Sequence, residues 1–111
     1  MTNKYNAEKT TVDGIRFDSK AEAERYTVLR DMERHGVISD LRLQAPIELI
    51  PACKVNGKTQ RAIIYKADFV YQQNGQRIVE DVKGFETKEY KIKKKILLWR
   101  YPDIAFYEIK K

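Results

Sequence analysis

The chain has 111 residues, a net charge of +6, one cysteine and one histidine. This length allows one domain with a modest core, and a single Cys with a single His excludes both a disulfide framework and a Cys/His zinc cluster. No apolar run is long enough to span a membrane, and the N-terminal residues lack the apolar segment of a signal peptide. We therefore expect a cytoplasmic protein in which any metal is held mainly by carboxylates.

The positive charge is concentrated near the C-terminus. Residues 1–82 contain 13 Lys or Arg against 12 Asp or Glu, whereas residues 83–111 contain 9 against 4. A basic segment of this kind suits a polyanion such as DNA. Lysine-rich helices are also often no more than solvated faces, so charge alone leaves both interpretations open.

The first third of the chain predicts an arm, a hairpin and a helix. Residues 1–9 are polar and are expected to form the arm, and the Asp13-Gly14 turn predicts a short hairpin over residues 10–17. A helix is predicted from Ser19, whose spacing to Glu22 matches a capping box, to Gly36. Its expected buried stripe consists of Ala21, Val28, Leu29 and Met32, with Tyr26 at one edge.

Strands are predicted in the middle of the chain. Residues 38–43 and 47–50 are strand-like. Gln44 between them either approaches the functional face of the sheet or is an ordinary loop amide, and the loop amide is favoured. Asn56-Gly57 marks a turn. The strongest hairpin pattern is Asn74-Gly75 between residues 63–71 and 77–83, because Asn-Gly favours a type I′ turn.

The register of this central hairpin places Asp68 directly opposite Asp81. At about 5 Å and an effective dielectric constant near 20, two carboxylates repel by roughly 3 kcal/mol. Lys66 and Lys83 on the same face could compensate, and so could a divalent cation, because hard cations prefer oxygen ligands. The opposite face is predicted to be apolar except for Glu80, with Tyr65, Ala67, Phe69, Tyr71, Ile78 and Val82.

A second helix is predicted over residues 87–100, followed by a strand over residues 104–109. Thr87 is the expected N-cap, and the buried face is expected to contain Ile92, Ile96, Leu97 and Trp99. The opposite side carries lysines that either track a phosphate backbone or are simply solvated: Lys88, Lys91, Lys94 and Lys95. The strand, helix, strand connection implies a parallel pair, so we expect an α/β fold with a mixed sheet in a single domain over residues 10–111.

These residues resemble the PD-(D/E)xK nuclease superfamily. Its pattern is an acid on the first helix, an Asp on a hairpin strand, and Asp/Glu-x-Lys on the partner strand, here Glu22, Asp68 and residues 81–83. The segments FDSKAEAERY, YKADFVY, VEDVKG and YPDI are further similar to small phage and prophage proteins related to Holliday junction resolvases. The chain departs from the superfamily pattern at Ala67, where Pro is common, and at Asp81, where Glu is usual.

The resemblance implies a restriction-endonuclease-like core and a metal-dependent endonuclease acting on DNA, including branched or recombination intermediates. Asp68, Asp81 and the Val82 carbonyl would bind Mg²⁺ or Mn²⁺, and Lys83 would orient water or stabilise charge. The helix acid would be Glu22 or Glu24, of which Glu22 is favoured. A homodimer and a bacterial cytoplasm as host compartment are implied as well. The alternative is a nucleic-acid-binding module with the same fold and no turnover, and a protein-interaction factor is a third hypothesis.

Overall fold

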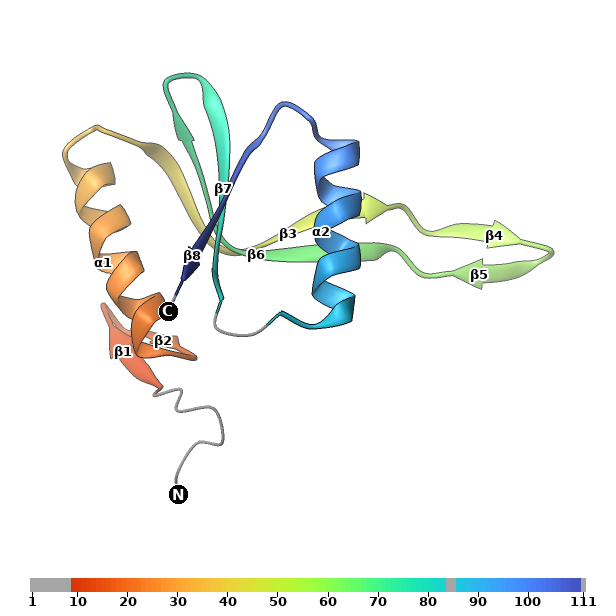
Figure 1. Ribbon diagram of the computed structural model, residues 1–111, viewed down its shortest axis with the longest axis horizontal. Coiled ribbons are helices and arrows are strands. Elements are labelled where there is room, and N and C mark those ends of the chain that lie inside the picture. The colour runs from red at the N-terminus through yellow and green to blue at the C-terminus, as the bar shows by residue number, and fades with distance from the viewer. Residues whose placement is uncertain (1–8, 84–85, 111) are drawn as a thin grey trace.

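The computed structural model describes residues 9–83 and 86–110, which form a mixed α+β fold (Figure 1). The elements are β1 (Thr10–Val12), β2 (Ile15–Phe17), α1 (Lys20–Arg34), β3 (Ser39–Ile50), β4 (Cys53–Val55), β5 (Lys58–Gln60), β6 (Ile63–Gln73), β7 (Gln76–Lys83), α2 (Lys88–Arg100) and β8 (Ala105–Lys110). The central sheet has the order β3-β6-β7-β8, in which only β7 and β8 run parallel. The mixed sheet and the parallel pair expected from the sequence are confirmed. No helix among the described residues is long and apolar enough to cross a membrane.

Local sequence rules account for the turns and the helix starts. The Asn74-Gly75 turn has φ angles of 53° and 77°, and it sets the register in which Gln73 pairs with Gln76. The Ser19 side chain accepts the N–H of Glu22 at 3.1 Å, which caps α1 as predicted. Thr87 caps α2 in the same way, accepting the N–H of Tyr90 at 3.0 Å.

The expected loop at Gln44 is not a loop. β3 runs without interruption through it, and Gln44 takes a positive φ of 50° between the paired residues Leu43 and Ala45. Pro46 is tolerated in this strand because β3 lies at the edge of the sheet, and edge strands are where proline is accommodated.

The strands β3 and β6 bend at Gln44 and Asp68, and this bend divides the core in two. On β6, Phe69 packs in the cluster beneath α1, whereas Ala67 packs in the cluster beneath α2. On β3, Leu43 and Ala45 divide in the same way. Figure 1 shows both strands curving from the side of α1 toward α2. The six apolar residues predicted to pack on a core are all buried, but they divide between two clusters and do not share one, because strict period-2 alternation assumes a strand without a bend.

The buried side of α1 was predicted in part. Tyr26 and Leu29 are buried and Met32 packs against them, but Val28 is 47% exposed. Glu22 is buried instead, at 8% exposure. Ala23 and Leu29 pack in one cluster with Phe69 and Tyr71. This packing sets the side of α1 that faces the sheet.

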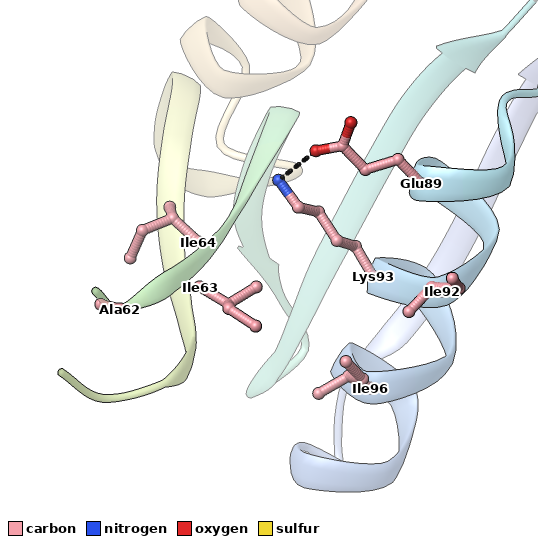
Figure 2. Close-up of a pocket in the computed structure, with 7 residues that line it drawn as sticks. All are labelled: Ala62, Ile63, Ile64, Glu89, Ile92, Lys93 and Ile96. Atoms are coloured by element: carbon pink, nitrogen blue, oxygen red, sulfur yellow. Dashed lines mark ion pairs between the residues drawn. The ribbon is translucent and has the colours of Figure 1, made fainter. Parts of the chain in front are cut away.

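The buried side of α2 was largely mispredicted. Leu97 is buried and Ile96 packs partly in the core, but Ile92 is 61% exposed and Trp99 is 80% exposed. The helix turns Tyr90 and Lys94 toward β8, where both bind Glu108. Figure 2 shows Ile92 and Ile96 instead lining an open pocket across from residues 62–64, beside an ion pair of 3.1 Å between Lys93 and Glu89. Apolar spacing could not reveal this orientation, because it depends on a partner on β8.

Candidate metal centre where β6 and β7 separate

Two aspartates replace the backbone ladder at the point where β6 leaves β7. The regular pairing of the hairpin ends at Phe69 and Glu80. One step further, the N–H of Asp68 donates to Asp81 Oδ1 at 3.0 Å, and the N–H of Val82 donates to Asp68 Oδ2 at 2.8 Å. Each carboxylate thus accepts a bond that a carbonyl would accept in a continuous ladder, and the two side chains are held facing each other.

Asp81 is fully buried and incompletely satisfied. Its exposure is 0%, and its Oδ2 atom has no hydrogen-bond partner among the described residues. Burial raises the pKa of Asp81 to about 6, although the Asp68 N–H and the positive charge of Lys83 act in the opposite direction. A buried acceptor without a partner costs free energy in a folded protein. This oxygen is therefore a candidate ligand for a bound cation.

Glu22 joins the two aspartates from the first turn of α1. The Gln44 amide links it to Asp68, because Nε2 donates to Asp68 Oδ1 at 3.2 Å and lies 3.5 Å from Glu22 Oε1. Burial, and then the negative charge of Asp68, raise the pKa of Glu22 to about 7. Glu24, the other helix acid considered from the sequence, is exposed.

The lysines of the hairpin do not neutralise these aspartates directly. Lys66 is exposed, and Lys83 places its Nζ 4.4 Å from the centre of the Tyr90 ring. In the part of the chain that the structure describes, neither lysine forms an ion pair with Asp68 or Asp81. Backbone N–H groups and the Gln44 amide therefore compensate the two carboxylates directly.

The donor set suits a divalent cation that needs few protein ligands. Within residues 9–83 and 86–110, no group of three or more His, Cys, Asp or Glu forms a ready-made metal cluster. Mg²⁺ is usually held by one or two carboxylates together with water and substrate phosphates, so it does not require such a cage. The unpartnered Asp81 Oδ2 beside Asp68 is the observation that fits this ion, with Glu22 close by.

Two polar neighbours of the site were missed by sequence reasoning. Gln44 was considered and interpreted as an ordinary loop amide. Glu108 was not considered, although β8 places it beside Asp81. It accepts bonds from Tyr90 Oη at 2.6 Å and Lys94 Nζ at 2.8 Å, and these bonds hold its pKa at about 2. Only the registers of β3 and β8 bring these residues to the site, and local sequence does not encode a register between distant strands.

The four lysines proposed to contact nucleic acid do not form one set. Lys88, Lys91 and Lys95 are exposed on α2. Lys94 is 28% exposed, and its ammonium is occupied by Glu108. Three of the four are therefore available to an anion from solution.

The protein thus has a mixed α+β fold in which a buried aspartate, Asp81, faces a partly buried one, Asp68. The chain belongs to the family described as "Protein of unknown function (DUF1064)", whose pattern matches residues 2–111. No match is found among curated proteins. Among solved structures the chain is similar to protein VC1899 from Vibrio cholerae, with 14% identity and a TM-score of 0.40. That similarity covers 90% of this chain and 35% of the other, so the chain spans about a third of its neighbour.

Proposed function

We propose that this protein is a metal-dependent endonuclease that hydrolyses DNA phosphodiester bonds. The observation that carries the proposal is the facing pair Asp68 and Asp81, with a buried Asp81 oxygen that has no hydrogen-bond partner among the described residues. The resemblance of Glu22, Asp68 and residues 81–83 to the PD-(D/E)xK pattern supports it. So does the order α1, β3, β6, β7, α2, β8, which we propose to be a restriction-endonuclease-like core.

Each side chain has a role in this proposal. Asp68 and Asp81 hold Mg²⁺ or Mn²⁺, with the Val82 carbonyl as a further oxygen ligand and Glu22 acting directly or through water. When bound, the cation supplies polarisation of the phosphoryl oxygen, a lowered pKa for an attacking water and charge neutralisation at the leaving oxygen. Lys83 orients the water or stabilises the negative charge that develops on the phosphoryl group.

The substrate we propose is DNA, including branched intermediates such as four-way junctions. The resemblance to resolvase-related phage proteins supports this choice, and so does the exposed position of Lys88, Lys91 and Lys95. Action on two strands favours a homodimer, and a bacterial cytoplasm is the proposed compartment.

The test is cleavage of end-labelled four-way junction and matched linear duplex with Mg²⁺ or Mn²⁺. Asp81→Asn keeps the size of the side chain and the acceptor for the Asp68 N–H, so it removes charge with little change in shape. Loss of outer-shell partners typically costs about 10- to 100-fold, and loss of a direct ligand should exceed that. Glu24→Gln is the matched control, because Glu24 is an exposed acid on the same helix as Glu22. The Glu24→Gln protein should cleave DNA like wild type.

Two results would overturn the proposal. Wild-type protein that leaves every substrate intact with both metals excludes the nuclease. Cleavage that persists in Asp81→Asn at the wild-type rate places the activity elsewhere.

A nucleic-acid-binding module without turnover is the second candidate function. It is favoured by the absence of a ready-made three-group metal cluster among the described residues and by the exposed lysines of α2. It predicts salt-sensitive DNA binding that is unchanged in Asp81→Asn, with no metal-dependent cleavage by either protein.

A further inference from the structure

A slender two-stranded ribbon projects from the body of the protein, away from the carboxylates. It consists of β4 and β5 joined at Asn56-Gly57, and Figure 1 shows it extending beyond the central sheet, at the end of the molecule opposite α1. Every residue from Pro51 to Arg61 is exposed. An isolated two-stranded hairpin is marginally stable at best in water, so a ribbon of this kind is expected to gain order from a partner.

The charge of the ribbon indicates what that partner is. Residues 51–61 include Lys54, Lys58 and Arg61 and contain no acidic residue. Val55 pairs with Lys58, and Lys54 pairs with Thr59. Because paired residues share a face and successive residues alternate, Lys58 lies on one face and Lys54 on the other. A ribbon with cations on both faces suits a groove whose two walls are both negative.

We propose that the ribbon formed by β4 and β5 enters the major groove of duplex DNA and binds the phosphates on both sides of it. The major groove is about 12 Å wide and admits a two-stranded β-ribbon. This inference rests on the proposed function for the identity of the ligand, and it adds a second contact far from the carboxylates.

The length of the strands places that contact. The path from Ala45, beside the carboxylates, to Val55 spans at most roughly 33 Å at about 3.3 Å per residue. This distance corresponds to roughly ten base pairs, or about one turn of DNA. The ribbon therefore binds the duplex within about one helical turn of the carboxylates.

The first test is the salt dependence of DNA binding, measured by fluorescence anisotropy with a 30-base-pair duplex in chelator, where no cleavage occurs. Each phosphate contact contributes about 0.9 to the slope of log affinity against log salt. The variant Lys54→Gln/Lys58→Gln should lower that slope by about 1.8. The matched control Arg34→Gln/Arg42→Gln removes two exposed cations from another region and should leave the slope unchanged.

The second test uses Cys53, the only cysteine of the chain, which is exposed on β4. An iron–EDTA reagent attached to Cys53 should cut the DNA backbone in a short tract. Its centre should lie within about ten base pairs of the metal-dependent cleavage position, if the chain cleaves.

The outcomes separate this inference from the nuclease proposal. An unchanged slope in the ribbon variant, or cutting by the tethered reagent that is uniform along the duplex, overturns the inference whether or not the protein cleaves DNA. A lower slope and a localised tract support the ribbon contact even if no metal-dependent cleavage is found, in which case only the nuclease proposal fails.

Discussion

Two adjacent acids on β7 are both buried, yet their surroundings are opposite. Glu80 is 1% exposed and accepts two bonds of 2.7 Å from Arg25, as well as one from the hydroxyl of Tyr71. Asp81 is 0% exposed, accepts one backbone N–H and keeps one oxygen without a partner among the described residues. Burial of an acid therefore does not by itself mark a site. The acid whose bonds are completed within the fold is structural, and the acid left incomplete can bind a ligand.

Removal of Glu80, the acid whose hydrogen bonds are complete, should reduce the free energy of unfolding most. Glu80→Ala leaves Arg25 without its partner, and breaking a buried pair costs 3–5 kcal/mol. Because Arg25 is 26% exposed, we expect a loss near the lower end, about 3 kcal/mol, in urea unfolding. Metal binding should persist wherever the variant is folded. A loss below about 1 kcal/mol would show that this pair is no more stabilising than a surface ion pair.

A substitution at Gln44 tests the polar support of Asp68, the aspartate that faces the incomplete acid. Gln44→Gly removes the amide that donates to Asp68 and lies near Glu22, while glycine readily adopts the positive φ of 50°. Loss of such an outer-shell partner should weaken Mn²⁺ binding about 10- to 100-fold, measured by calorimetry. Gln72→Gly, a substitution at a partly buried glutamine on β6, is the control for a general loss of strand stability. Equal effects of the two variants on Mn²⁺ affinity would remove Gln44 from the site.

Removing charge from the incomplete acid should stabilise the metal-free protein. Ionised Asp81 at pH 8 is unfavourable in the fold because its pKa of about 6 lies above the ordinary value of 3.8. Asp81→Asn relieves that cost but leaves an amide with an unmatched donor, so we expect a net gain of roughly 1 kcal/mol in chelator. Addition of Mn²⁺ should stabilise wild type and not the variant.

The same shifts predict how stability depends on pH. Asp81 and Glu22, with pKa values of about 6 and 7, bind more protons in the folded than in the unfolded state. Stability in chelator should therefore fall as pH rises from about 5 to 8. Glu108, whose pKa of about 2 lies below the ordinary value of 4.5, has the opposite effect between about pH 2 and 5, so the trend is measured above pH 5. A pH dependence that is the same in wild type and Asp81→Asn would contradict the assignment to Asp81.

The smallest expected effects distinguish two neighbouring lysines on α2. Lys95→Gln removes an exposed cation and should lower the salt slope of DNA binding by about 0.9. Lys94→Met should leave the slope unchanged and cost about 1 kcal/mol of stability, because Lys94 is bound to Glu108 at 2.8 Å. Equal slopes for the two variants would show that exposure on α2 does not decide which lysine contacts DNA.

The sequence by itself determined the local structure of this protein. Ser19, Thr87 and the Asn-Gly turns act through bonds and φ angles within a few residues, so both helices and the hairpin register could be predicted. The register in turn predicted that Asp68 and Asp81 would face each other. These are short-range properties, and short-range chemistry is sufficient to set them.

Only the tertiary structure decided which surfaces are buried and which acid remains incomplete. The position of Gln44 beside Glu22, the exposure of Trp99 and the ion pair of Lys94 with Glu108 could not be predicted from the sequence. Each depends on elements far apart in the chain. The bend of β3 and β6 also changes which side chains share a face, and no period-2 pattern contains it. Burial depends on packing between elements, so it follows from how the two helices pack on the sheet.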